Sequence, residues 1–444
     1  MSVLLSFVLG AMALGSDLQL FVDDTVVESM DGVRYELQTP VPRDIAIRFD
    51  KPWEGFASAY LTVFKDGDKY RGFYRGLSAL DAQEVTCTAE SVDGIVWTKP
   101  ELGIIDYGGS TANNAVWTGP GSHSFFVFLD TNPAAKPEEK YKAIGGDPLL
   151  AFISPDGYHW NKVRDEPIYT EGHFDSLNTV FWNPLKNRYE AFLRDWPNGT
   201  RSIRITTSTD FLTWSPATTF DFGSTPAEHL YTNAVLPYFR APNVYLGFPK
   251  RFSPDREAPP QLSTSSGVSD AVFMSSRDGI HWKRWGEAFI RPGLDQKNWT
   301  HRNMMTSHGI LETAPGELSL YVSEHYMHDD AYIRRYTVRT DGFVSVSADA
   351  TGGTFVTKPF TFTGRELILN YSTSAAGSIR VQIETEDGKA LPAFGLTDCD
   401  EIYGDHIERA VTWVGDPNVS TFGRKTVRLR FQMKDADLFS FRFR

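Results

Sequence analysis

The chain has 444 residues, with 44 lysines and arginines against 56 aspartates and glutamates, and a formal net charge of −12. This length allows two or three domains, or one large radial domain with an appendage. The acidic balance argues against a nucleic-acid-binding protein and against attachment to an anionic membrane surface. With Cys87 and Cys399 as the two cysteines, we expect no cysteine-based metal site. Two buried thiols are expected there, with one disulfide as the alternative.

The N-terminus carries an apolar run over residues 2–15, about as long as the core of a signal peptide and followed by small residues. The run is too short to span a bilayer, so no membrane span is predicted. We therefore predict a signal peptide over residues 1–16 and a secreted or periplasmic protein. A buried first strand is the alternative, because no lysine or arginine stands near Met1.

A short phrase with the pattern Ser-x-Asp-x-x-x-Trp recurs four times. The copies run over residues 91–97, 154–160, 208–214 and 276–282, and their aspartates are 63, 54 and 68 residues apart. The Asp begins a tight turn in which its carboxylate bonds local backbone amides. The Trp buries a large apolar surface between neighbouring sheets. A repeat at this period is typical of repeat architectures, and the spacing suits the four-stranded blade of a β-propeller.

Strand and turn patterns after Asp17 predict five such blades, and a closed ring of blades has no exposed strand edges. Blade one runs from Ala59 through Tyr70 to Trp97. Blade two is predicted to contain strands 114–116, 125–129 and 149–153 and Trp160, and blade three strands 179–182, 189–193 and 203–207 and Trp214. Blade four is predicted to contain strands 234–238, 244–248 and 271–275 and Trp282. Blade five is predicted to contain strands 309–312, 318–323 and 331–338 and a degenerate turn at 341–343.

The remaining segments complete an all-β fold. Residues 252–269 are rich in Ser and Pro and predict a surface loop or a lid over the central funnel. Gly and Ala around 348–354 predict a linker, and the short alternating strands that follow have the length and spacing of a β-sandwich. The predicted fold is a five-bladed β-propeller over residues 17–350 followed by a β-sandwich over residues 354–444.

The residues just before the inner strands of a small propeller converge on its central funnel. An Asn recurs there in four predicted blades, where its side chain is expected to bond backbone groups. Acids stand out in three blades, at Glu54, Asp175 and Glu228. Carboxylates that converge raise one another's pKa unless they are compensated, so three acids at one funnel indicate a function. Glycoside cleavage is a function that uses such acids. One acid protonates the leaving oxygen, a second attacks the anomeric carbon or activates water, and a third holds the sugar hydroxyls.

With these features the chain resembles the five-bladed β-propeller glycoside hydrolases of the furanosidase type, families 32, 43 and 68. The resemblance covers the blade count, the repeated phrase, the following β-sandwich, and acids that stand 121 and 53 residues apart. It implies that Glu54 is the nucleophile or base, that Asp175 stabilises the sugar hydroxyls and that Glu228 donates the proton. Asp50 and Asp24 are the alternatives for the role of Glu54. The family's own phrases around these acids are replaced here by Trp53-Glu54-Gly55, Phe174-Asp175-Ser176 and Glu228-His229.

Arginines recur near the inner strands, and arginine binds carboxylate or sulfate groups through two-point contacts. Several arginines in one funnel would suit an acidic or sulfated sugar, whereas pairing with nearby aspartates is the structural alternative. Tryptophan can stack on a sugar face or pack in the core. The predicted substrate-binding residues are Trp53, Asn114, Asn178, Arg194, Asn233, Arg251, Arg302 and His325.

We predict a glycoside hydrolase that acts on an oligo- or polysaccharide through its carboxylates and requires no cofactor. A structural Ca²⁺ near Asp398, Asp400 and Glu401 is an alternative to solvated acids at that place. The competing functions are a non-catalytic carbohydrate-binding propeller and a sialidase-like or lyase-type enzyme on an acidic sugar. The expected partner is a carbohydrate, with no nucleic acid and no membrane span.

Overall fold

The computed structural model describes residues 12–262 and 266–444, in which strands dominate and the helices are short 3₁₀ turns. The chain divides into two compact units. One is Thr39–Val338, and the other combines the segment up to Gln38 with Arg339–Arg444. The predicted signal peptide, residues 1–16, lies mostly outside the described residues. Within the described ranges, no helix is both long enough and apolar enough to cross a bilayer.

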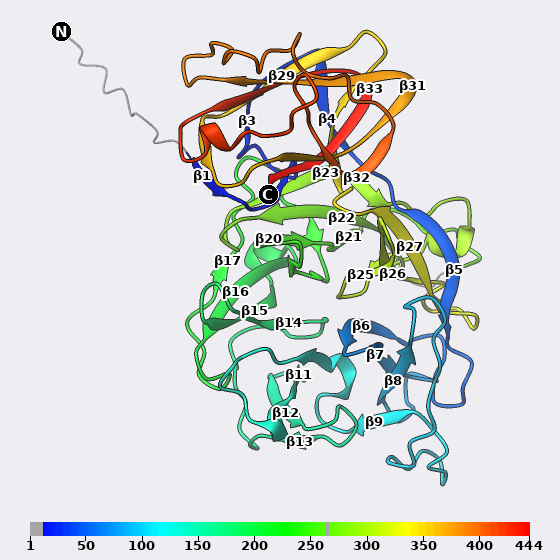
Figure 1. Cartoon of the computed structure of the whole chain (residues 1–444). Helices are drawn as coiled ribbons and strands as arrows, with labels where there is room; N and C mark the ends of the chain where they lie inside the picture. The colour runs from blue at the N-terminus through cyan, green and yellow to red at the C-terminus, as the bar shows by residue number, and fades with distance from the viewer. Residues whose placement is uncertain (1–11, 263–265) are drawn as a thin grey trace, which may run out of the picture. The chain divides into compact units, whose positions relative to one another are not determined.

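The Thr39–Val338 unit is a five-bladed β-propeller, as predicted, with its sheets arranged in a ring (Figure 1). Blade one contains β6 (Ala59–Asp66), β7 (Lys69–Gly76), β8 (Val85–Ser91) and β9 (Ala115–Thr118). Blade two contains β10 (Phe126–Leu129), β11 (Tyr141–Gly145), β12 (Leu150–Ser154) and β13 (Asn161–Lys162). Blade three contains β14 (Thr179–Asn183), β15 (Arg188–Asp195), β16 (Ser202–Ser208) and β17 (Thr218–Thr219).

Blade four has interrupted inner strands. It contains β18 (His229–Leu230), β19 (Leu236–Tyr238), β20 (Ala241–Gly247), β21 (Lys250–Ser253), β22 (Val268–Ser276) and β23 (Trp282–Ile290). β20 and β21 both pair with β22, while β19 pairs with β20 and β18 with β21. The short β18–β21 pair places Tyr231 beside Lys250, whose backbone carbonyl accepts the Tyr231 N–H over 2.8 Å.

Blade five closes the ring with a strand from the beginning of the unit. β24 (Met305–Thr306) and β25 (Leu311–Ala314) pair with β26 (Glu317–Glu324), and β27 (Tyr332–Arg339) pairs with β5 (Val41–Arg48). Joining the first strand to the last blade leaves the ring without an open break between its ends. The degenerate turn predicted at 341–343 lies instead in the other unit.

One predicted strand belongs to a different blade. Residues 114–116, predicted as the inner strand of blade two, fall at β9, which pairs with β8 at the outer edge of blade one. The inner strand of blade two is β10, and the predicted strands do not include its neighbour β11. A short apolar run shows that a strand is present, but the neighbour with which it pairs is decided by tertiary packing.

All four copies of the repeated phrase form the same turn, directly after the third strand of blades one to four. In each copy the Asp carboxylate accepts backbone N–H groups from two and three residues further on. The Trp indole donates to the carbonyl three residues before it. The phrase is therefore a structural turn, as its pattern predicts.

The other unit is built on an eight-stranded sheet and forms the predicted β-sandwich module. Its strands are β2 (Gln19–Leu20), β3 (Val27–Asp31), β4 (Val33–Leu37), β28 (Val344–Ala348), β29 (Gly353–Thr357), β31 (Leu367–Glu384), β32 (Asp405–Ala410) and β33 (Arg428–Phe443), and β1 (Met12–Gly15) pairs with β30 (Phe360–Phe362). Residues 17–38, predicted to belong to the propeller, instead contain β2, β3 and β4, which pair with strands of the C-terminal part.

The cysteines and the acids near residue 400 have structural partners. Cys87 and Cys399 are free, buried thiols. Asp398 accepts the Gly395 N–H, Asp400 accepts two donors from a neighbouring turn, and Glu401 pairs with an arginine. Among the residues that the structure describes, no group of three or more His, Cys, Asp or Glu side chains could hold a metal ion. The Ca²⁺ alternative is therefore not supported.

Candidate active site

A cavity of about 370 Å³ lies where all five blades of the propeller meet. This volume falls within the range of roughly 300–1,000 Å³ that is typical of small-molecule sites. The lining residues are Tyr60 and Arg75 of blade one; His123, Ser124, Gly146 and Asp147 of blade two; Phe174 and Asp175 before blade three; Tyr231 of blade four; and Arg302 and Tyr326 of blade five. We call this the funnel cavity.

Asp175 presents an accessible carboxylate to the funnel cavity, with 57% of its side chain exposed. Its Oδ1 lies 3.2 Å from His123 Nε2, and the Tyr231 hydroxyl donates to Oδ2 over 3.4 Å. The hydrogen bond from His123 lowers the pKa of Asp175 below its usual range and outweighs the opposing effect of burial. Asp175 is therefore ionised at neutral pH, so it can act as a base or nucleophile but not as a proton donor.

His123 lies between two carboxylates. Its Nδ1 is 2.8 Å from Glu84 Oε1, and its Nε2 faces Asp175. Hydrogen bonds to Asp175 and Glu84 raise the pKa of His123, although burial and the nearby Arg75 oppose them. A raised pKa extends the protonated form of the imidazole to higher pH, and a protonated imidazole can donate its proton. The funnel cavity thus contains an ionised carboxylate beside a group that can supply a proton.

Tyrosine hydroxyls form much of the polar wall. Tyr60 has a φ of 61°, a conformation that bulky residues rarely adopt and that often marks a functional site. Burial raises the pKa of Tyr60 and of Tyr231, so both hydroxyls stay neutral. Arg75 lies 4.7 Å from the centre of the Tyr60 ring and donates to the Tyr326 hydroxyl over 2.9 Å. These neutral hydroxyls can donate hydrogen bonds to a sugar.

Two of the arginines predicted to bind substrate lie at the funnel cavity. Arg302 lines it directly, with a φ of 70°. Arg194 lies just behind Asp175, where Nη1 donates to the Asp175 backbone carbonyl over 2.6 Å and lies 3.5 Å from Oδ2. Arg194 therefore both fixes the loop and partly neutralises its carboxylate.

The three predicted asparagines have a structural role instead. Asn114, Asn178 and Asn233 are all buried and donate to the backbone carbonyls of Thr88, Phe174 and Phe192. Asn178 bonds the Phe174 carbonyl and accepts the Arg194 backbone N–H, which fixes the loop that presents Asp175. The expected side-chain to backbone bonds are confirmed, but these buried amides do not line the funnel cavity.

Glu54 is buried in blade one, with no exposed side-chain surface. Its Oε2 lies 2.6 Å from Lys99 Nζ, and its Oε1 accepts the Tyr74 hydroxyl over 2.6 Å. Its neighbour Trp53 donates its indole N–H to Asn114 Oδ1 over 2.7 Å. Because a carboxylate enclosed in this way cannot contact an anomeric carbon, the expected role of Glu54 as nucleophile or base is not supported.

Glu228 belongs to an ion-pair cluster in blade four. Arg284 contacts its Oε2, and Arg251 Nη1 lies 3.4 Å from its Oε1. Arg251 also bonds both oxygens of Asp270, at 2.9 and 2.6 Å. Guanidinium groups occupy both oxygens of Glu228, so neither is placed to pass a proton to a substrate. The predicted roles of Glu228 and Arg251 in catalysis and binding are therefore not supported.

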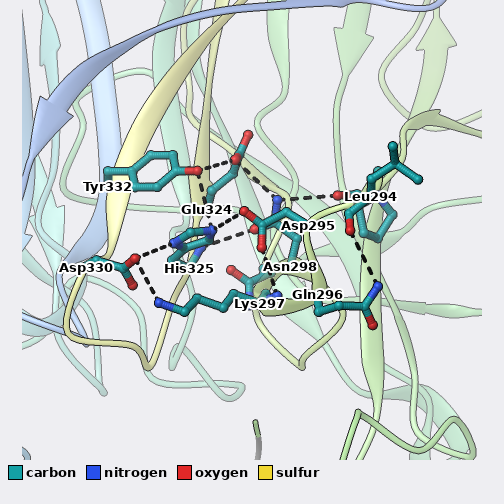
Figure 2. Close-up of polar contacts among 12 residues, drawn as sticks. Leu294, Asp295, Gln296, Lys297, Asn298, Glu324, His325, Asp330 and Tyr332 are labelled. Carbon is teal, nitrogen blue, oxygen red and sulfur yellow. Dashed lines mark hydrogen bonds and ion pairs between the residues drawn. The ribbon is translucent and has the colours of Figure 1, made fainter.

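His325 lies in a network beside blade five (Figure 2). Its Nε2 is 2.8 Å from Asp295 Oδ2, its Nδ1 is 3.1 Å from Asp330 Oδ2, and Lys297 Nζ donates to Asp330 over 2.9 Å. The buried imidazole bridges two loops next to Tyr326, which lines the funnel cavity. His325 thus supports the wall rather than reaching a ligand.

Sequence reasoning missed Tyr60, His123 and Asp147. His123 lies in the 3₁₀ turn η1 (Ser122–Ser124), just before β10, the true inner strand of blade two. The inner strand of blade two was predicted one segment too early, at 114–116. The residues considered as the entrance of blade two therefore belong to blade one. With the correct register, the positions inspected before the inner strand of blade two would have included His123.

The comparisons with known proteins show a distant similarity of fold. No protein-family model and no curated protein matches the chain. Similar solved structures include a glycoside hydrolase, with 14% identity over 68% of this chain and 92% of that chain and a TM-score of 0.48. An N-acetylgalactosamine deacetylase from F. plautii, in complex with blood group B trisaccharide, has 13% identity over 68% and 94% and a TM-score of 0.45. A Bombyx mori family-32 β-fructofuranosidase has 8% identity over 90% and 94% and a TM-score of 0.44.

Proposed function

We propose that this protein cleaves a glycosidic bond in the funnel cavity. The observation that carries the proposal is the contact between Asp175 and His123, an ionised carboxylate beside a histidine with a raised pKa. Glycoside cleavage needs one group that attacks the anomeric carbon or activates water, and another that protonates the leaving oxygen. The lowered pKa of Asp175 suits the first task, and the raised pKa of His123 suits the second.

In this proposal Asp175 acts as the nucleophile or base and His123 as the proton donor. Glu84 holds the His123 ring from the far side, at 2.8 Å. Asp147 supplies a second carboxylate to the same cavity, and its Oδ2 accepts the Phe174 N–H over 3.1 Å. We assign Asp147 to the sugar hydroxyls, together with the neutral Tyr60 and Tyr231. These roles replace those that the sequence assigned to Glu54 and Glu228.

The proposed setting is outside the cytoplasm, because the apolar run at residues 2–15 has the length of a signal-peptide core. The resemblance to furanosidase-type families makes furanosides one class of substrate to test. We expect no cofactor, since the carboxylate and the histidine can carry both proton transfers.

The test is to incubate the purified full chain with a panel of plant and algal polysaccharides, furanosides included, and to measure released reducing ends. D175N should lower the rate by roughly 100- to 10,000-fold, the range for losing an acid–base group. D165N removes an exposed carboxylate of the same propeller, whose side chain is 88% exposed, and should leave the rate unchanged.

Two results would count against the proposal. Cleavage that persists in D175N would remove Asp175 from the machinery. Glycan binding without turnover by the wild-type chain would favour the competing function, a non-catalytic carbohydrate-binding propeller.

A further inference from the structure

Several cations gather around one wall of the funnel cavity. Lys250 Nζ lies 4.0 Å from the centre of the Tyr231 ring, and the guanidinium carbons of Arg194 and Arg201 lie 5.1 and 5.5 Å from it. Tyr231 and Arg302 both line the cavity. Positive charge is thus concentrated at one place in a chain whose net charge is −12.

Most of this charge has no acidic partner. Among the described residues, Arg201, Arg302 and Lys250 form no ion pair with a carboxylate; Arg201 approaches His229 Nδ1 at 3.4 Å, and Arg302 donates its backbone N–H to a serine. Arg194 lies within 4 Å of one carboxylate, that of Asp175. The Nε atoms of Arg194 and Arg201 are also buried without a hydrogen-bond partner. The fold therefore leaves guanidinium donors unused beside the cavity.

Burial and neighbouring cations act against the charges of Lys250 and Arg201, and the Asp175 carboxylate only partly offsets them. Burial lowers the pKa of Lys250 well below its usual range, and Arg302, Arg201 and Arg194 lower it further. Burial, and then Arg194 and Arg302, also lower the pKa of Arg201. Burial, and then Arg302, Lys250 and Arg201, lower the pKa of His301 to about 4. Desolvated like charges cost stability, and a bound anion offsets that cost.

We propose that Arg201 and Arg302, with Lys250 behind them, bind the carboxylate or sulfate group of an anionic sugar. The substrate is then a uronic-acid-containing or sulfated glycan, a conclusion that rests on the proposed function. Guanidinium groups suit both anions because their N–H donors match paired oxygens. Trp196 is 36% exposed, and the Arg194 and Arg201 guanidinium groups lie 4.8 and 4.5 Å from its ring. The exposed part of its indole can contact the sugar ring that carries the anion.

Calorimetric titration with matched probes tests the subsite in the D175N full chain. One pair is an oligogalacturonide and its methyl ester, and the other is a sulfated oligosaccharide and its desulfated form. At least one charged probe should bind tenfold or more tightly than its neutral partner. R201Q and R302Q should each weaken that binding by about tenfold to hundredfold, the effect of losing one charge-assisted hydrogen bond, and leave the neutral probe unaffected.

R164Q is the matched control. Arg164 is an exposed arginine of the same propeller that bonds backbone carbonyls, so its loss should not change either affinity. Equal binding of charged and neutral partners in both pairs would overturn the subsite, as would an equal loss of both probes in R201Q.

Failure of the subsite is distinguishable from failure of the proposed function. Charge-selective binding without any glycan cleavage by the wild-type chain keeps the subsite and removes the glycosidase. Cleavage of neutral glycans with no preference for charge keeps the glycosidase and removes the subsite.

Thermal unfolding provides a second readout that needs no sugar. Inorganic sulfate should raise the Tm of the wild-type chain more than that of R201Q, because a ligand of the folded state stabilises it. R201K keeps the charge but loses the planar two-point donor, and it should also lose most of the sulfate response. An equal response in all three chains would contradict the subsite.

Discussion

Two groups of arginines in the propeller have opposite surroundings. In blade four, Arg251 bonds both oxygens of Asp270, and Arg284, whose side chain is 3% exposed, contacts Glu228. At the funnel cavity, Arg201 and Arg302 have no carboxylate partner among the described residues. The arginines of the first group are neutralised by carboxylates of the fold, whereas those of the second are available to an anion from outside the chain. In this propeller, the absence of a carboxylate partner distinguishes the arginines that we propose for binding from those that form internal ion pairs.

The largest expected effect is on activity, and it comes from comparing a double variant of each arginine group. The double variant R201Q/R302Q should lower kcat/KM on the anionic glycan by about 100- to 10,000-fold, since two charge-assisted hydrogen bonds are lost. R251Q/D270N removes both partners of an internal pair and leaves Glu228 in contact with Arg284, so kcat/KM should change less than about twofold. A large loss in R251Q/D270N with the fold intact would place the paired cluster in the site after all.

A smaller effect concerns stability. R284Q leaves Glu228 without its buried partner and should lower the free energy of unfolding by about 1–3 kcal/mol. R201Q removes a cation that its neighbours repel, and should leave that free energy unchanged or raise it. Urea denaturation of both variants, each measured against wild type, checks the contrast. Equal destabilisation by both would mean that Arg201 has an internal partner in solution.

The smallest effect is a shift in the pH profile. His123 has a pKa raised above 6.5 by Asp175 and Glu84, so cleavage should decline as pH rises through that raised value. The same bonds contribute stability that is fully present below pH 6.5 and is lost as pH rises through the folded-state pKa. E84Q removes one of them and should move the alkaline limb of kcat/KM to lower pH by roughly one unit or less. A limb that does not move in E84Q would indicate another proton donor.

Glu54 and Glu228 were predicted to be catalytic, but the structure places both in ion pairs. Those ion pairs could not be predicted from the sequence. Glu54 pairs with Lys99, 45 residues away, and Glu228 contacts Arg284, 56 residues away. A partner at that distance in the chain leaves no local pattern, so an acid before an inner strand looks the same whether it is paired or accessible. Asp175 was correctly placed at the funnel because its blade was in the right register.

The sequence alone determined the scaffold of this protein. Each Ser-x-Asp-x-x-x-Trp turn forms its bonds within seven residues, so the phrase is sufficient to predict the turn and the period of the blades, although the fifth blade carries no copy of it. Tertiary structure decided which strand joined which blade, and therefore that His123 faces Asp175. It also decided which charges met a partner, because ion pairs depend on distances between strands that are remote in sequence. The turns are set by local hydrogen bonds, and the site by the charges that folding left unpaired.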